Sequence, residues 1–186
     1  IIEQVIVLCK SQNPALRYRS CEIVATLINY LEEMDDFLFK VIKTTITERI
    51  RDKDSNIRKL AIIALCKLQN TGVENDDKSV RDTLLKVIQF EPKADIRRVA
   101  IFNIDVNGET FPHIVERILD KDSKCRLLTL KKIYSNVESP LDLPVDEREK
   151  IIYCGLSDRD ISVRKAAVQL LEKWCQIAGG ALPFLR

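Results

Sequence analysis

One stretch of the sequence recurs along the chain, and its clearest copy is Asp52-Lys53-Asp54-Ser55-Asn56-Ile57-Arg58-Lys59-Leu60-Ala61. Two acidic residues stand one apart, an arginine follows six residues after the first of them, and an amphipathic helical pattern begins there. The same phrase returns at 158–167 and, with less agreement, at 120–129. Weaker copies begin at Lys93 and at Asn13. This recurrence predicts an array of similar structural units.

The arginines of the five copies set the period of the array. They are Arg17, Arg58, Arg97, Arg126 and Arg164, with separations of 41, 39, 29 and 38 residues. Three of the four separations lie near 40 residues, which is the length of two helices and two turns and the period of HEAT and armadillo repeats. The sequence Asp105-Val106-Asn107-Gly108 predicts an early end of the helix after Arg97, which explains the spacing of 29.

Apolar residues recur with helical spacing from the residue before Arg58 and from the residue before Arg164 onwards. In the unit that contains Arg58 they are Ile57, Leu60, Ala61, Ala64, Leu65 and Leu68. In the unit that contains Arg164 they are Val163, Ala166, Ala167, Leu170, Leu171 and Trp174. Both sets mark one face of a helix, at identical offsets. The small alanine at the third place of each set predicts a close approach by a neighbouring helix.

These patterns predict an all-α fold, a HEAT-repeat (armadillo-like), right-handed α-solenoid of antiparallel helix pairs. In each repeat an A helix, a tight turn and a B helix follow one another. We expect five repeats, over residues 1–31, 32–70, 78–107, 110–137 and 145–178. Polar connectors, such as residues 69–78, separate them. The chain has few glycines and prolines and shows no strand pattern, which argues against an all-β fold.

Composition excludes several classes of function. The formal net charge is +2, so bulk charge does not favour a nucleic-acid or membrane partner, and any such partner must be recognised by a local patch. No apolar run is long enough to span a bilayer. The six cysteines lie far apart without metal-ligand spacing, which predicts free thiols and no metal or cofactor. The chain opens inside an apolar run without an initiator methionine, so we expect a piece of a longer protein.

The acidic residues and arginines of the turns predict a structural ladder. Asp54 and Asp160 stand where a B helix begins and can cap it. A cation in the first turn opposes the helix dipole, so each arginine needs the carboxylates of its own turn or of the next repeat's turn. The predicted ladder residues are Asp52, Asp54, Arg58, Arg97, Asp120, Arg126, Asp158 and Arg164. Phosphate binding by the arginines is the alternative.

The repeats resemble a known family over nearly the whole chain. The segments that carry the resemblance are Leu16–Cys21, Arg51–Arg58, Ala61–Gln69, Asp95–Arg98, Thr110–Arg117 and Gly155–Trp174. In this order, with the short 29-residue unit in its place, they resemble the HEAT array of the condensin subunit of the CAP-G type, in its N-terminal half. Residues 104–108 and 139–147 match that family poorly.

The resemblance implies a non-enzymatic condensin subunit. Such a subunit binds the kleisin subunit and, together with it, holds double-stranded DNA in a basic groove without reading its sequence. It thereby helps to load the condensin ATPase, which belongs to the SMC subunits, onto chromosomes for mitotic condensation. The implied location is the nucleus and chromosomes, with the cytoplasm as an interphase alternative, and no membrane or small molecule is implied as a partner.

Basic residues on the B helices are the candidate DNA contacts. They recur one and nine residues after the arginine, with Lys131 and Lys132 between, and positions one, five and nine follow one side of a helix. The set is Lys59, Lys67, Arg98, Lys131, Lys132, Lys165 and Lys173. Such a row would contact backbone phosphates, with an affinity that falls steeply with salt. The alternative is an ordinary solvated helix face.

Two other classes of function stay open from the sequence. One is a protein-only HEAT scaffold of the transport-receptor or phosphatase-scaffold type, and the other is a cohesin-type HEAT subunit. Salt-dependent binding of duplex DNA would distinguish the condensin hypothesis from the scaffold hypothesis. No catalytic constellation is present, and His113 is the one histidine, so we predict no enzymatic activity.

Overall fold

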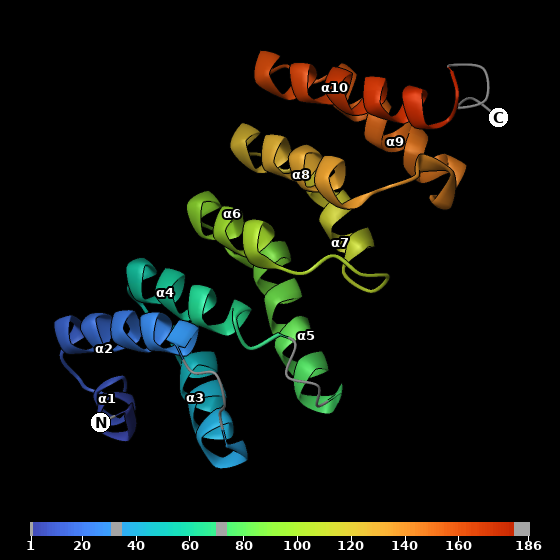
Figure 1. The fold of residues 1–186 in the computed structure, drawn as a ribbon. Helices are drawn as coiled ribbons and strands as arrows, with labels where there is room; N and C mark the ends of the chain where they lie inside the picture. The colour runs from blue at the N-terminus through green and yellow to red at the C-terminus, as the bar shows by residue number, and fades with distance from the viewer. Residues whose placement is uncertain (1, 31–34, 70–73, 181–186) are drawn as a thin grey trace. The chain divides into compact units, whose positions relative to one another are not determined.

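The fold is built from helix pairs (Figure 1), as the apolar periodicity predicts. A computed structural model describes residues 2–30, 35–69 and 74–180, and within that range no strand occurs. The A helices are α1 (Ile2–Leu8), α3 (Asp36–Arg49), α5 (Glu74–Phe90), α7 (Phe111–Glu116) and α9 (Val145–Leu156). The B helices are α2 (Pro14–Leu27), α4 (Ser55–Cys66), α6 (Ala94–Asn103), α8 (Ser123–Asn136) and α10 (Ile161–Ile177).

Short 3-10 helices extend or precede several of these elements. They are η1 (Ile28–Tyr30), η2 (Arg117–Leu119) and η3 (Pro140–Asp142). No helix in the described ranges is long and apolar enough to cross a membrane. The chain forms two compact units, residues 1–105 and residues 106–186, which we call unit 1 and unit 2.

In unit 1 the B helices lie side by side, with α4 between α2 and α6 (Figure 1). Each of these B helices packs against the A helix of its own pair. The face predicted from the sequence forms the core, where Ile57, Ala61 and Leu65 are fully buried. Burial of these side chains is the main source of the stability of the unit, because isolated helices of this length are marginal in water.

In unit 2 the B helices α8 and α10 lie together, with α9 packed against α10. Val163, Ala167, Leu170 and Trp174 of α10 are fully buried in a common core with side chains of α8 and α9. The small residue at Ala167 has the predicted effect, because a Cβ placed on Gly155 of α9 would lie 2.6 Å from the Ala167 Cβ. The two helix backbones therefore approach each other closely at this point.

Two element boundaries bear on the sequence interpretation. The helix α6 ends at Asn103, as Asp105–Gly108 predicts, and it is the shortest of the described B helices. The connector expected over 69–78 is shorter than predicted, because α5 already begins at Glu74. Residues 31–34 and 70–73 lie outside the described residues.

Candidate functional site

Each described turn from an A helix to a B helix is held by the arginine of its repeat. The Arg58 Nη1 donates hydrogen bonds to the carbonyl oxygens of Asp52 and Lys53, at 3.0 and 3.3 Å. The same atom of Arg17, Arg97 and Arg126 donates to the carbonyls six and five residues earlier, and that of Arg164 to the carbonyl six residues earlier. These carbonyl dipoles compensate a cation that the first turn of a helix would otherwise disfavour.

The remaining guanidinium donors join one turn to the next. Nε and Nη2 of Arg17 bind the two carboxylate oxygens of Asp52, at 2.8 and 3.2 Å. Arg58 binds Glu91 in the same way, at 3.1 and 2.9 Å. Arg126 binds Asp158 at 2.5 and 2.8 Å. We call each two-bond contact a rung, and this planar, bidentate geometry is the strongest that arginine and a carboxylate adopt.

Of the predicted ladder residues, Arg97 lies in unit 1 and Asp120 in unit 2. Their pairing therefore stays a prediction. Two residues outside the predicted set, Arg17 and Glu91, take part in rungs. The signal that identifies Glu91 is its position six residues before Arg97, which is the separation of Asp52 from Arg58.

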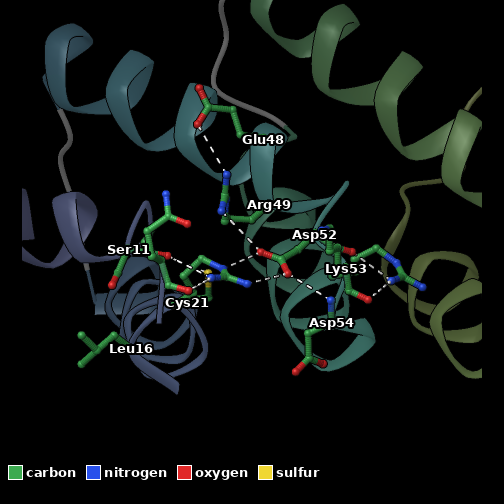
Figure 2. A network of polar contacts seen from close by, with 12 residues as sticks. Ser11, Leu16, Cys21, Glu48, Arg49, Asp52, Lys53 and Asp54 are labelled. Atoms are coloured by element: carbon green, nitrogen blue, oxygen red, sulfur yellow. Dashed lines mark hydrogen bonds and ion pairs between the residues drawn. The ribbon is translucent and has the colours of Figure 1, made fainter. Parts of the chain in front are cut away.

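The Asp52 carboxylate is the centre of the first rung (Figure 2). Its side chain is 3% exposed, and besides Arg17 it contacts Nη1 of Arg49 at 3.4 Å and accepts the N–H of Asp54 at 3.0 Å. Burial alone would raise the pKa of Asp52, but the hydrogen bonds from Arg17 and from the Asp54 N–H lower the pKa below its ordinary value. The carboxylate is therefore ionised and held from three sides.

The second acidic residue of each phrase caps the B helix. Asp54, Asp122 and Asp160 accept the N–H groups of Asn56, Cys125 and Ser162 respectively, each at 2.8 Å. Lys93 occupies the cap position of α6 and makes no such bond. The hydroxyl and N–H of Ser162 hold the pKa of Asp160 at about 2. In the phrase Asp-x-Asp, the first carboxylate therefore binds the turn and the arginine, and the second caps the B helix.

We expect acid to weaken unit 2 through these carboxylates. A carboxyl group whose pKa is lower in the folded state than in the unfolded chain stabilises the fold above its unfolded pKa, and the stabilisation is lost as the pH falls through the folded pKa. The pKa values of Asp158 and Asp160 are both lowered, the first chiefly by Arg126. The urea midpoint of unit 2 should therefore drop between about pH 4 and about pH 2.

The variant Asp160→Asn should make this acid-induced drop shallower. Asparagine also caps helices well, so the variant should stay folded at neutral pH. The measurement is the urea midpoint at a series of pH values, with Asp142→Asn, an exposed carboxylate outside the ladder, as the control. Parallel pH profiles for Asp160→Asn and the unmodified chain would show that this carboxylate does not carry the effect.

Lys67 and Lys173, which are candidate DNA contacts, both donate to backbone carbonyls. The Lys67 Nζ donates to the Ala25 carbonyl of α2 at 2.9 Å, and burial lowers the pKa of this ammonium group. The Lys173 Nζ donates to the carbonyls of Tyr134 and Val137 at the end of α8, at 2.5 and 3.2 Å. Each lysine therefore places its charge at the C-terminal end of the preceding B helix, where free carbonyls and the helix dipole favour a cation.

The other five candidates lie on the B helices α4, α6, α8 and α10. Lys59, Arg98 and Lys132 are half-buried, and Lys131 and Lys165 are exposed. In unit 2, Lys131 lines a hollow of about 170 Å³ between α8 and α10. Tyr134, Ser135 and Gln169 also line this hollow.

Two of the side chains that could carry thiol chemistry lie together, because the Sγ atoms of Cys9 and Cys21 are 4.0 Å apart. All six cysteines are free, four of them buried. In the described part of the chain, no three His, Cys, Asp or Glu side chains gather closely enough to hold a metal ion.

Two relatives of known sequence carry the same name. The chain is 35% identical to Condensin complex subunit 3 of Schizosaccharomyces pombe, over 92% of this chain and 20% of that protein. It is 26% identical to Condensin complex subunit 3 of Homo sapiens, over 92% of this chain and 17% of that protein. The chain thus spans about a fifth of the length of these relatives. The family described as "HEAT repeat associated with sister chromatid cohesion" matches residues 150–171, which include most of α9 and the first part of α10.

Solved structures agree in fold. A chain in the crystal structure of the S. pombe condensin Cnd3-Cnd2 subcomplex matches 99% of this chain with a TM-score of 0.87 and 32% sequence identity, and this chain covers 24% of it. An engineered protein matches 96% of this chain with a TM-score of 0.57 and 16% identity, which supports the fold alone. The predicted HEAT-repeat α-solenoid is confirmed by these matches together with the helix pairs.

Proposed function

We propose that this chain is part of the HEAT-repeat subunit of condensin, of the CAP-G type, and that it acts without enzymatic activity. The observation that supports this most is the agreement with the Cnd3-Cnd2 subcomplex, which combines 32% sequence identity with a TM-score of 0.87 over 99% of the chain. A helical-repeat protein outside this family agrees much less well with the chain. The engineered protein has 16% sequence identity and a TM-score of 0.57. The proposed location is the nucleus and chromosomes.

The proposed partners are the kleisin subunit, in the place of Cnd2, and double-stranded DNA. For DNA we assign phosphate contact to the other five candidates, Lys59, Arg98, Lys131, Lys132 and Lys165. We place Lys67 and Lys173 outside this set, because their ammonium groups already donate to backbone carbonyls. Moving them to a phosphate would leave those carbonyls without a donor, which costs about 1–3 kcal/mol for a buried acceptor. Contact with phosphates alone would make the binding independent of sequence.

The test uses the full-length subunit in complex with its kleisin. Changing all five cations to glutamate should lower the affinity for duplex DNA at least tenfold. It should also reduce the slope of log K against log salt by about 4 if every cation contacts a phosphate. The control reverses five exposed lysines that lie off the B helices, Lys10, Lys40, Lys78, Lys86 and Lys150, with the same change in net charge.

Equal losses in the two variants would mean that the net charge, and not these five side chains, governs the binding of DNA. Failure of the unmodified subunit to co-purify with kleisin would overturn the condensin assignment itself. Two alternatives would give different outcomes. A protein-only scaffold would bind no duplex DNA, and a cohesin-type subunit, which the family match over residues 150–171 favours, would co-purify with the kleisin of cohesin instead.

A further inference from the structure

Two cysteines of the first helix pair lie together in its core. Cys9 follows the last residue of α1, and Cys21 lies in α2, twelve residues later in the chain. Their Sγ atoms are 4.0 Å apart, with the Cys21 thiol donating to the Cys9 sulfur, and both side chains are fully buried. A disulfide bond is about 2.05 Å long, so the two atoms would have to approach by about 2 Å to form one.

The two thiols differ in their chemical environment. The hydrogen bond from Cys21 and, more weakly, the Arg49 guanidinium lower the pKa of Cys9, against the opposing effect of burial. The hydrogen bond to Cys9 and burial raise the pKa of Cys21. In the described part of the chain the buried Nε of Arg49 has no hydrogen-bond partner. Cys9 is therefore the thiol that ionises first, and the thiolate is the form that reacts.

The position of Cys9 at the end of α1 gives an oxidant a route to its sulfur. The Cys9 N–H closes the last turn of the helix, because it donates to the carbonyls of Val5 and Ile6 at 3.2 and 3.1 Å. Leu8 and Lys10 on either side are exposed. Opening this single turn would bring the thiol to solvent, and the ends of helices open at a much lower free energy than the core. A small oxidant therefore reaches Cys9 without unfolding of the helix pair.

We propose that Cys9 and Cys21 form a modification site, at which hydrogen peroxide oxidises the pair to a reversible disulfide between α1 and α2. The Cys9 sulfur attacks one peroxide oxygen, the O–O bond breaks, and the products are a sulfenic acid on Cys9 and one water. The Cys21 sulfur then attacks the Cys9 sulfur, and the S–O bond breaks. The oxygen leaves as a second water with the proton of the Cys21 thiol. The two sulfurs lose two electrons, which the peroxide gains, and this step is independent of the proposed function.

The disulfide would join the A helix and the B helix of the first repeat beside the first rung. Arg17, which binds Asp52 in that rung, stands one helical turn before Cys21 in α2. Cys21 itself lies near the contact between Asp52 and Arg49 (Figure 2). Oxidation would therefore hold α1 against the helix that carries the rung. The amides of α1 should then exchange their hydrogens about tenfold more slowly, because local opening of this helix is restricted.

The test treats the folded full-length protein with hydrogen peroxide and then blocks the remaining thiols with N-ethylmaleimide. Trypsin cuts after Lys10 and after Arg19, so Cys9 and Cys21 fall on different peptides. Mass spectrometry without reduction should find these two peptides joined, and a thiol reductant should separate them. Hydrogen exchange of α1 is measured before oxidation, after it and after reduction, and the slower exchange should be reversed by the reductant.

Two controls show whether the pairing of the thiols is the cause. Cys125 is as deeply buried as Cys9 and should form no link. In the variant Cys21→Ala the sulfenic acid on Cys9 has no thiol to react with, so dimedone should trap it there, and peroxide should not slow the exchange of α1. A joined peptide that forms only in urea, or a Cys9 that stays fully reduced, would mean that the two thiols only pack against each other. Unchanged exchange rates in the oxidised protein would equally overturn the proposal.

Discussion

Replacing Arg126 with methionine is expected to lower the free energy of unfolding of unit 2 by about 3–5 kcal/mol. The Arg126 and Asp158 side chains are 8% and 6% exposed, so the substitution leaves a carboxylate that is nearly buried without its cation. It also removes the donor that Arg126 gives to the carbonyls of Asp120 and Lys121. Methionine keeps the apolar stem, so the loss measures the charged fork and its hydrogen bonds.

Urea unfolding followed by tryptophan fluorescence measures this loss. Trp174 is the single tryptophan of the chain and lies fully buried in the core of unit 2, so its emission reports on this unit. The control is Arg159→Met in the same turn. Arg159 is exposed and makes one hydrogen bond of 3.5 Å, so its loss should stay within about 0.5 kcal/mol. Similar urea midpoints for the two variants would contradict a stabilising rung.

A second substitution distinguishes the loss of the rung from a general loss of stability. Asp158→Asn neutralises the carboxylate while keeping an oxygen that can accept the Asp160 N–H. In the double variant Arg126→Met/Asp158→Asn the unpaired charge is gone, so the loss should be smaller than the sum of the two single losses. Additive losses would mean that the two side chains act independently, in spite of their two hydrogen bonds.

The sequence carries the ladder because its spacing is regular. In each turn the acidic residue stands six residues before the arginine, so one identifies the other. The period of about 40 residues then predicts that each arginine contacts the acidic residue of the following turn. Asp52, Arg58, Arg126 and Asp158 were therefore accessible to prediction. Glu91 was overlooked because the phrase there reads Glu-Pro-Lys, without the second acidic residue that makes the other copies visible.

The roles of Lys67 and Lys173 could not be predicted from the sequence. Both stand nine residues after the arginine of their repeat, in line with the other cations of the B helix. Their acceptors are carbonyl groups 42, 39 and 36 residues earlier, at the ends of other helices. Backbone carbonyls leave no trace in a sequence pattern, so a lysine that caps a neighbouring helix looks the same as one that faces solvent or DNA.

Gly155 is the position where we expect the second large effect. The substitution Gly155→Val should lower the free energy of unfolding of unit 2 by about 3 kcal/mol. A Cβ on Gly155 would lie 2.6 Å from the Ala167 Cβ, and both atoms are attached directly to helix backbone. No side-chain rotation can relieve such a contact, so α9 and α10 must move apart and loosen the core around Trp174. The urea midpoint by Trp174 fluorescence measures the loss.

Exchanging Gly155 and Ala167 tests whether the close approach of α9 and α10 causes this loss of stability. Gly155→Ala alone should gain some helix propensity but destabilise through the contact, and Ala167→Gly alone should lose about 1 kcal/mol of helix propensity. The double variant keeps one glycine and one alanine at the facing positions, so the propensity terms cancel and the Cβ on α9 meets open space. Its stability should therefore return close to that of the unmodified chain, with a coupling energy of at least 1 kcal/mol. If the losses of the two single variants simply add, the close approach of α9 and α10 does not limit the size of residue 155, and the fall caused by Gly155→Val must arise elsewhere.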